Sequence, residues 1–373
     1  MGNKNKNVLI YNFGQHYREP IFKKMDQELS VDFYFGDNSE DIKIFDYNEL
    51  KGYKGILKYV KLYKIFYWQK GLMSLAFKNY SNYILLGEYF CITHWLLFIV
   101  LKIKGKKIIL WSHGWYGNEG IGKRIIKKMY FSFADKILLY GDYAKQLMIK
   151  ENIAGEKLDI IYNSLDFEEQ DRIYRSLSKT NIYKDHFKNN NKVVFYIGRL
   201  QKRKKIEQII FALKELQKDE IFINLVIIGK GEKEEDLRNL VENNNLGSYV
   251  WFYGATYKEE EIAELINNAD LCISPGNVGL TAMHSLVYGT PVITHSNFKN
   301  QMPEFEAIVP GVSGDFFVED SLDDLKSKIK DWIVVRKDEE TISENCRKVI
   351  KDKYNPDYQI EIIKRIINDF DEK

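Results

Sequence analysis

The chain has 373 residues, of which 45% are hydrophobic and 29% are charged, and its formal net charge is +2. This length allows two or three domains with separate cores, and the composition excludes a disordered chain. The three cysteines, Cys91, Cys272 and Cys346, have no Cys or His partner at metal-ligand spacing. The sequence therefore predicts neither a disulfide framework nor a zinc site, and it is typical of a protein kept in a reducing cytoplasm.

No stretch of the sequence predicts a membrane span. The most hydrophobic run, residues 96–101, is far shorter than the roughly 20 residues that a spanning helix needs. The first apolar run, residues 8–11, is too short for the hydrophobic part of a signal peptide. We therefore expect a cytoplasmic protein that can associate with a membrane only at its surface.

The first half of the chain alternates apolar strands with helices. Residues 8–11 form a buried-type strand, a loop containing Gly14 follows, and a helix begins near Glu19. Further strands are expected at residues 31–35, 83–86, 107–110, 136–140 and 158–162, with helices at 91–102 and 122–133. Such alternation predicts a parallel sheet covered on both faces. We assign residues 1–166 to a Rossmann-like domain.

The second half repeats this alternation after a polar, asparagine-rich segment. We place a linker at residues 167–190 and a second Rossmann-like domain at 191–355. The last segment, 356–373, begins with Pro356 and is predicted to be an amphipathic helix with an isoleucine face.

Three glycine-containing loops in the second domain indicate an anion site. The stretch CISPGNVGLTAMHSLVYGTPVIT (272–294) reads as strand, loop, helix and strand, and such a loop presents backbone N–H groups at a helix start. About 80 residues upstream, a strand ends in Gly198 and Arg199 and is followed by four consecutive basic residues, 202–205. A third strand ends at Gly229 and Gly231. Ligands of open parallel sheets bind beyond the carboxyl ends of the strands, so the implied ligand is a diphosphate.

Five sequence blocks in this half carry a family resemblance. They are GRLQKRKKIEQIIFAL, LVIIGKGEKEEDLRNL, WFYGATYKEEEIAELINNADLCISPG, GLTAMHSLVYGTPVIT and MPEFEAIVPGVSGDFF. Their order and spacing resemble the donor domain of GT-B glycosyltransferases, specifically the retaining family 4. The resemblance implies an α/β GT-B fold: two Rossmann-like domains face a cleft, and the C-terminal helix crosses back to the N-terminal domain.

The resemblance also implies the activity and the residues that perform it. It implies a retaining glycosyltransferase that moves a sugar from a nucleotide diphosphate sugar, with no further cofactor. The cations of Arg199 and Lys204 would stabilise the departing diphosphate, and His113 would lie near the reacting centre. The implied donor-binding residues are Gly14, Gly198, Arg199, Lys204, Gly229, Gly231, Gly254, Asn277, Val278, Gly279, Leu280, Thr281 and His284. The expected acceptor-binding residues are His16, Arg18, Tyr116 and Glu119. The sequence has no DxD motif of the kind that holds a metal-bound diphosphate, so we expect no metal.

The sequence departs from the family pattern at three positions. The family has two glutamates on the donor sugar and ribose, where this chain has Gly276 and His284. Lys205 stands where the family usually has glycine. The basic run could also be a solvated helix start, and His113 and His284 could be packed structural histidines. The missing carboxylates keep a non-catalytic GT-B homologue open as an alternative and count against a GT-B epimerase, whereas the lack of Gly-x-Gly-x-x-Gly disfavours an NAD-dependent oxidoreductase.

The first domain carries two basic clusters that suggest what it binds. Residues 51–80 contain seven lysines, eight aromatic residues and no acidic residue, and a second cluster lies between Lys102 and Lys128. Anionic lipid headgroups attract such segments, and aromatic side chains lie at the headgroup level. A solvated basic face and nucleic acid binding are the alternatives. We expect an inner-leaflet membrane surface, no nucleic acid, and a lipid-linked or oligosaccharide acceptor of bacterial surface polysaccharide synthesis. UDP-hexose or UDP-N-acetylhexosamine is the favoured donor, with a GDP-sugar as the alternative.

Overall fold

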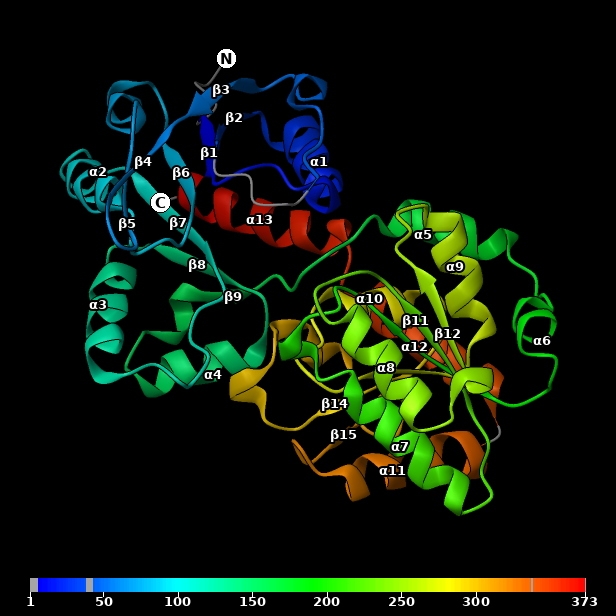
Figure 1. The fold of residues 1–373 in the computed structure, drawn as a ribbon. Coiled ribbons are helices and arrows are strands. Elements are labelled where there is room, and N and C mark those ends of the chain that lie inside the picture. The colour runs from blue at the N-terminus through cyan, green and yellow to red at the C-terminus, as the bar shows by residue number, and fades with distance from the viewer. Residues whose placement is uncertain (1–5, 38–42, 337, 373) are drawn as a thin grey trace. The chain divides into compact units, whose positions relative to one another are not determined.

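The computed structural model describes residues 6–37, 43–336 and 338–372. The chain divides into two compact units, of which unit 1 is Met1–Asp166 with Asn355–Lys373, and unit 2 is Phe167–Tyr354. Each unit contains an open parallel sheet with helices on both faces (Figure 1). The predicted α/β class with two Rossmann-like halves is confirmed.

Unit 1 is built on a seven-stranded parallel sheet in the order β3-β2-β1-β6-β7-β8-β9. Its strands are β1 Asn7–Tyr11, β2 Val31–Gly36, β3 Tyr53–Leu57, β6 Asn82–Leu86, β7 Lys107–Ser112, β8 Lys136–Leu139 and β9 Leu158–Ile160. Its main helices are α1 Glu19–Leu29, α2 Ile92–Ile103, α3 Ile121–Ser132, α4 Asp142–Lys150 and α13 Pro356–Asp371. The order reverses direction between β1 and β6, which is where ligands of such sheets bind.

Alternate residues of the central strands supply the two cores of unit 1. Val8 and Ile10 of β1 face a core that includes Phe98 of α2 and Tyr130 of α3. Leu9 faces the opposite core, which contains side chains of α1 and α13. Because both faces are covered, the strands read as continuous apolar runs, and this is why they are predictable from the sequence.

The C-terminal helix α13 belongs to unit 1. Its four isoleucines are buried in the same core as Phe22 of α1: Ile360, Ile363, Ile366 and Ile367. At its start, Gln359 accepts a hydrogen bond from the Ser164 hydroxyl (2.7 Å) and donates one to the Tyr162 carbonyl (2.8 Å). The predicted return of this helix to the N-terminal domain is confirmed.

The basic aromatic stretch 51–80 forms regular structure that the sequence reading did not specify. It contains β3, the antiparallel pair β4 Tyr59–Tyr63 and β5 Phe66–Gln69, and the 3-10 helix η3 Leu72–Phe77. Lysines interleaved with aromatics hide the strand period, because a long lysine can lie along a sheet edge with its charge in water. No helix in the described ranges is long and apolar enough to cross a bilayer.

Unit 2 has a six-stranded parallel sheet in the order β12-β11-β10-β13-β14-β15. Its strands are β10 Val193–Ile197, β11 Asn224–Ile228, β12 Val250–Gly254, β13 Leu271–Ser274, β14 Val292–His295 and β15 Gly314–Phe317. Its helices are α5 Phe167–Ser176, α6 Ile182–Phe187, α7 Glu207–Lys218, α8 Glu234–Asn243, α9 Glu259–Asn268, α10 Leu280–Val287, α11 Leu322–Lys330 and α12 Glu339–Lys353. The switch in direction falls between β10 and β13.

Residues 167–190, which we expected to form a linker, are part of unit 2. They carry α5 and α6, and buried Ile173 and Tyr183 anchor these helices. The Tyr183 hydroxyl donates a hydrogen bond to the Leu265 carbonyl of α9 (2.5 Å). The apolar anchors are only two among many polar residues, so composition alone indicated a linker where the tertiary structure has a packed layer.

Candidate active site

Two loops of unit 2 meet at the switch point of its sheet. One loop follows β10 and runs from Gly198 through the 3-10 helix η5 Lys202–Lys204, and the other joins β13 to α10. The N–H of Gly276 donates to the Lys204 carbonyl (3.0 Å), and the Lys204 ammonium donates to the Asn277 carbonyl (2.6 Å). The Thr281 hydroxyl donates to the Ile197 carbonyl (2.9 Å). The structure thus brings together the two loops that the sequence assigned to the diphosphate.

The cations of this site lie in different environments. Arg199 is exposed, whereas Lys204 is half-buried. Burial, with a contribution from the Arg203 cation and against an opposing effect of Glu304, lowers the pKa of Lys204 to about 8. A bound anion would raise this pKa again and favour the charged ammonium. Lys204 therefore has the environment of a ligand-binding lysine.

Lys205, which stands where the family usually has glycine, adopts a backbone conformation that favours glycine. Its φ is +50°, in the left-handed region that favours glycine. Its ammonium bonds to Glu319 (2.9 Å) and Asp320 (2.6 Å). These ion pairs hold Lys205 away from the site, so only part of the basic run 202–205 is available for an anion.

Gly276 has no room for the carboxylate that the family carries at this position. A Cβ placed on Gly276 would lie 2.1 Å from the Arg203 carbonyl oxygen and 2.7 Å from the Lys204 Cα. Glycine at 276 is therefore required by the close approach of the two loops. The contact between the two loops therefore accounts for the absence of the first glutamate.

His284, which stands where the family has its second glutamate, has a carboxylate beside it. His284 of α10 lies with Nδ1 3.7 Å from Glu259 Oε1 of α9, which is too long for a hydrogen bond. Although burial acts in the opposite direction, His284 and hydrogen bonds from Gln170 and Tyr288 lower the pKa of Glu259 to about 2. Sequence reasoning missed Glu259, because only the fold brings the start of α9 next to α10.

Part of the backbone of the loop before α10 is already hydrogen-bonded within the protein. Val278 is buried, and its N–H donates to Gln301 Oε1 (2.9 Å), so our expectation that Val278 contacts the donor is not supported by the structure. Gly279 is the N-cap of α10, and Leu280 and Thr281 form its first turn. The side-chain oxygen of Asn277 is buried and has no hydrogen-bond partner among the described residues. Asn277 and the first turn of α10 remain the donor candidates here.

The other predicted glycines lie where neighbouring loops approach. A Cβ on Gly229 would lie 1.9 Å from the Gly198 carbonyl oxygen, and one on Gly231 would lie 2.4 Å from the Leu200 carbonyl oxygen. Gly254 ends β12, and its carbonyl accepts from the Gly229 N–H (2.8 Å). Gly229 and Gly231 therefore let the loops after β10 and β11 pack side by side at the same end of the sheet as Lys204.

Unit 1 has a cavity of about 350 Å³ at the carboxyl ends of β1, β6, β7 and β8. Aromatic and polar side chains line it: Tyr11, Asn12, Gln15, Tyr17, Arg18, Glu88, Tyr89, Phe90, Trp111, Ser112, His113, Tyr116, Lys123, Lys127 and Tyr140. A concave site that combines aromatic surfaces with polar groups is typical of small-molecule binding. The cavity includes the predicted residues His113, Arg18 and Tyr116.

His113 lies in this cavity as a neutral imidazole. Burial, with the nearby cations of Arg18 and Lys127, lowers the pKa of His113 to about 4. Its ring centroid is 4.7 Å from that of Tyr140, and its Nδ1 is buried without a hydrogen-bond partner in the described part of the chain. Arg18 donates to the Tyr140 hydroxyl (2.6 Å), which fixes the tyrosine beside the histidine. His113 can therefore exchange hydrogen bonds with a bound hydroxyl without carrying charge.

Glu88 is a cavity residue that sequence reasoning missed. It is 7% exposed and accepts a hydrogen bond from the Tyr59 hydroxyl (2.7 Å). Burial raises the pKa of Glu88 to about 7, while the bond from Tyr59 acts against this shift. The available sequence signal was its position two residues after the end of β6, in a strand-end loop of a parallel sheet.

Three predicted residues do not line the cavity. Gly14 packs against the rings of Phe45 and Tyr47, and His16 is exposed with Nδ1 3.1 Å from the Lys43 carbonyl. The side chain of Glu119 is 1% exposed and is bonded to Lys127.

The Glu119 carboxylate organises the loop behind His113. It accepts hydrogen bonds from the N–H groups of Tyr116 (3.0 Å) and Gly117 (2.9 Å), as well as from Lys127 (2.7 Å). Since these bonds use both oxygens, we reassign Glu119 from acceptor binding to the support of this loop.

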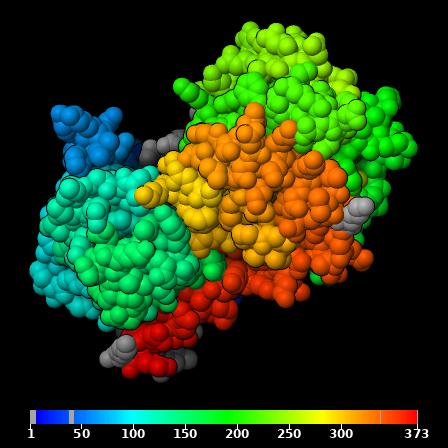
Figure 2. All heavy atoms as spheres, turned by 90° about the horizontal axis from the view of Figure 1, so that it is seen from below, coloured from blue at the N-terminus to red at the C-terminus, as the bar shows by residue number. Residues whose placement is uncertain are grey.

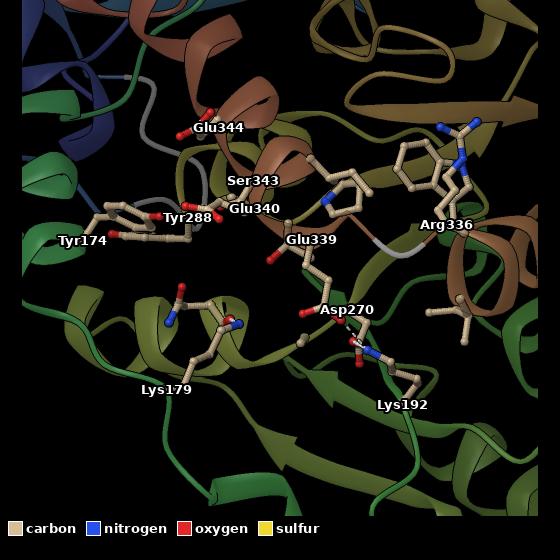
Figure 3. A pocket seen from close by; sticks show the side chains of 18 residues that line it. Tyr174, Lys179, Lys192, Asp270, Tyr288, Arg336, Glu339, Glu340, Ser343 and Glu344 are labelled. Carbon is tan, nitrogen blue, oxygen red and sulfur yellow. Dashed lines mark hydrogen bonds and ion pairs between the residues drawn. The ribbon is translucent and has the colours of Figure 1, made fainter.

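A second cavity, of about 340 Å³, lies in unit 2 at the amino ends of the strands, opposite the anion site (Figure 3). It is next to the starts of β10, β13 and β14. Lys192 donates to Asp270 (2.7 Å) and Glu339 (2.6 Å) within it. These charges are already paired, so the cavity adds nothing to the anion site. Among the described residues, no group of three or more His, Cys, Asp and Glu side chains is placed to hold a metal ion.

Comparisons with known proteins agree with this geometry. Residues 178–349 match the family model described as Glycosyl transferases group 1. An uncharacterized glycosyltransferase of Methanocaldococcus jannaschii is 26% identical over 290 residues, which are 72% of this chain and 70% of the relative. Alpha-monoglucosyldiacylglycerol synthase of Streptococcus pneumoniae is 32% identical over 109 residues, 28% of this chain and 24% of the relative.

The fold matches solved structures over nearly the whole chain. HepE of Anabaena in complex with UDP aligns with a TM-score of 0.72 and 15% identity, covering 96% of this chain and 99% of HepE. At this identity the likeness shows the fold. The chain therefore has the GT-B fold of two Rossmann-like units, and residues 178–349, which lie within its second unit, match the Glycosyl transferases group 1 model.

Proposed function

We propose that this protein is a retaining glycosyltransferase that uses a nucleotide diphosphate sugar. The observation that carries the proposal is the joining of the 198–204 and 276–281 loops at the β10/β13 switch point, with Lys204 half-buried between them. A helix start and a cation at one place form a diphosphate site. The match to the group 1 family and the UDP bound to HepE support this assignment.

In the proposed reaction the bond between the anomeric carbon and the diphosphate oxygen breaks, and an acceptor hydroxyl bonds to the same carbon with retention. Negative charge grows on the departing diphosphate. Arg199, Lys204 and the first turn of α10 would stabilise this charge, and we propose that no metal is needed. Asn277 and His284 would bind the sugar and ribose in place of the missing carboxylates.

We assign the acceptor to the cavity of unit 1. His113, Glu88 and Arg18 supply polar groups, and Trp111 and Tyr140 supply aromatic surfaces. The acceptor class that we propose is a lipid-linked sugar or oligosaccharide of surface polysaccharide synthesis, made at the inner face of a membrane. The Streptococcus pneumoniae relative, alpha-monoglucosyldiacylglycerol synthase, is named for a glycolipid, and this supports an acceptor with a lipid part.

A panel of nucleotide sugars in a release assay tests the reaction and the donor. We expect a UDP-hexose or UDP-N-acetylhexosamine to be consumed, and His113→Ala to slow release while UDP binding to unit 2 is kept. A clear preference for a GDP-sugar would replace the donor assignment. Binding of UDP without any turnover, with every acceptor tried, would favour the non-catalytic alternative that the residues at 276 and 284 left open.

A further inference from the structure

The outward face of α2 is apolar. Leu96, Ile99 and Ile103 share one side of the helix and are 41%, 48% and 81% exposed. The other side carries Leu97, Phe98 and Leu101, which are buried in the core of unit 1. A helix that is hydrophobic on all sides belongs in a protein interior or against a membrane, and this one is covered on only one side.

The neighbouring helix α3 has the same property. Ile121, Ile125 and Met129 follow each other at four-residue spacing and are 76%, 56% and 57% exposed. Tyr130 and Phe131 on the opposite side are buried. Figure 2 shows the face of unit 1 on which the segment containing α3 and α4 (green-cyan) lies toward the viewer. A solvated helix face normally carries charged residues throughout, whereas here the exposed Arg124 and Lys128 flank an apolar row.

The two apolar faces belong to adjacent helices. The Trp95 and Tyr130 rings have centroids 5.3 Å apart, and those of Phe98 and Phe133 are 5.9 Å apart. α2 and the end of α3 therefore touch through these rings, and both helices lie on the same side of unit 1 (Figure 1). Contiguous exposed apolar surface of this kind marks an interaction site.

Cations border this apolar surface. Between residues 89 and 134 the only acidic residue is Glu119, which is bonded to Lys127 inside the unit. The basic residues of the same segment are Lys102, Lys104, Lys106, Lys107, Lys123, Arg124, Lys127 and Lys128. Lys102 and Arg124 are paired with Asp135 and Glu151, and Lys127 is buried, so the cations that can border the surface are among the other five. Lys104 Nζ lies 4.3 Å from the centroid of the Phe77 ring, which is 71% exposed and extends the apolar surface at the end of η3.

Charge decides between the possible occupants. A second copy of this chain would bring the same cations face to face, which opposes self-association through this surface. A bilayer with anionic headgroups offers both an apolar interior for the isoleucines and negative charge for the lysines.

We propose that the outward faces of α2 and α3, together with Phe77, are the surface by which unit 1 docks on an anionic lipid bilayer. This inference rests on the proposed lipid-linked acceptor and names the residues that meet the lipid. It places the contact on α2, α3 and Phe77 and not on the whole 51–80 stretch. Two lysines of that stretch are engaged within unit 1: Lys54 lies 3.5 Å from Asp32, and Lys78 donates to the Tyr34 hydroxyl (2.7 Å).

Vesicle sedimentation of the full chain tests the surface. The variant Ile99→Gln/Ile103→Gln/Ile125→Gln/Met129→Gln keeps helix-forming residues at exposed positions, so circular dichroism should show an intact fold. On vesicles of phosphatidylcholine with phosphatidylglycerol, we expect its partition coefficient to fall by about tenfold or more. The matched control Val318→Gln/Val335→Gln changes side chains of unit 2 that are 60% and 64% exposed and should bind as the unchanged protein does.

The charge requirement has its own pair of variants. Lys106→Gln/Lys128→Gln should weaken binding to anionic vesicles, whereas Lys218→Gln/Lys348→Gln in unit 2 should not. Equal binding by the four-residue variant and the unchanged protein would overturn the proposal. A dimer that the same variant dissociates, without vesicle binding, would overturn it in favour of a second copy. Because vesicle binding is measured without a nucleotide sugar, transfer without binding would refute only the surface, and binding without transfer would refute only the proposed reaction.

Discussion

The Lys204 ammonium donates a hydrogen bond to the Asn277 backbone carbonyl over 2.6 Å. The two residues are far apart in the chain, yet this bond and the return bond from the Gly276 N–H to the Lys204 carbonyl (3.0 Å) join two loops into one site. A lysine that holds the loop and faces the anion acts on both the shape and the charge of the site.

Replacing Lys204 should remove most of the transfer activity. We expect Lys204→Ala to lower kcat/KM by roughly 30- to 1,000-fold, since a charge-assisted contact to the departing diphosphate contributes about 2–4 kcal/mol. Lys202→Ala, in the same turn but exposed, is the control and should keep near-normal kinetics. Equal activity of the two variants would show that the diphosphate binds elsewhere.

The pKa of Lys204 gives this site a pH dependence. The free protein loses this proton near pH 8, so nucleotide diphosphate affinity should be constant below that pH and weaken as the pH rises above it. Titration calorimetry with UDP between pH 6 and 10 measures the effect. Lys204→Arg, whose charge does not titrate in this range, should flatten the profile, and an unchanged profile in this variant would assign the titration to another group.

A side chain at Gly276 should separate the loops. Gly276→Ala places a Cβ 2.1 Å from the Arg203 carbonyl oxygen, and such overpacking costs about 1–3 kcal/mol of the free energy of unfolding. Urea unfolding with a UDP-binding assay would detect both the lower stability and the weaker binding. Gly247→Ala is the matched control in unit 2, because a Cβ there meets no atom within 4 Å. If both variants behave alike, the close approach is not required.

Glu88 should make the stability of unit 1 depend on pH. Its pKa is about 7 in the folded chain against an ordinary value of 4.5, so the unfolded chain loses the proton first as the pH rises. The free energy of unfolding should fall by on the order of 3 kcal/mol as the pH rises from 4.5 to about 7. Glu88→Gln should match the unchanged protein near pH 4.5 and be more stable than it above pH 7.

Exposed Glu156→Gln serves as the control for Glu88 and should follow the unchanged protein at every pH. Parallel curves for Glu88→Gln and the unchanged protein would contradict a raised pKa. Chemical denaturation followed at several pH values measures all three.

The Glu119–Lys127 pair should act on stability, and Glu119, which does not line the cavity, should not act on the acceptor. Both side chains are nearly inaccessible, 1% and 6% exposed, so removing one partner leaves a buried charge. Lys127→Met should cost about 3–5 kcal/mol, and Glu119→Gln/Lys127→Met should recover much of this loss. Thermal unfolding and acceptor KM are the two measurements. A raised acceptor KM in Glu119→Gln with unchanged thermal stability would return Glu119 to acceptor binding.

The sequence by itself determined the architecture and the anion loops. Buried parallel strands such as β10 and β11 are continuous apolar runs, Gly198 and Gly229 mark where these two strands end, and Gly279 marks the start of α10. These signals are local, because strand burial and turn chemistry act on neighbouring residues. Local signals also identified α13, whose isoleucine spacing matches its buried face.

Only the tertiary structure decided which polar groups meet. Lys204 and Gly276 come together because β10 pairs with β13, and Glu88 and His113 share a cavity because β6 pairs with β7. Residues 167–190 looked like a linker until two buried side chains placed them in a layer. In the sequence, the exposed isoleucines of α2 and α3 look the same as buried isoleucines. Their exposure depends on which helix faces the rest of unit 1 covers, and no local sequence pattern indicates this.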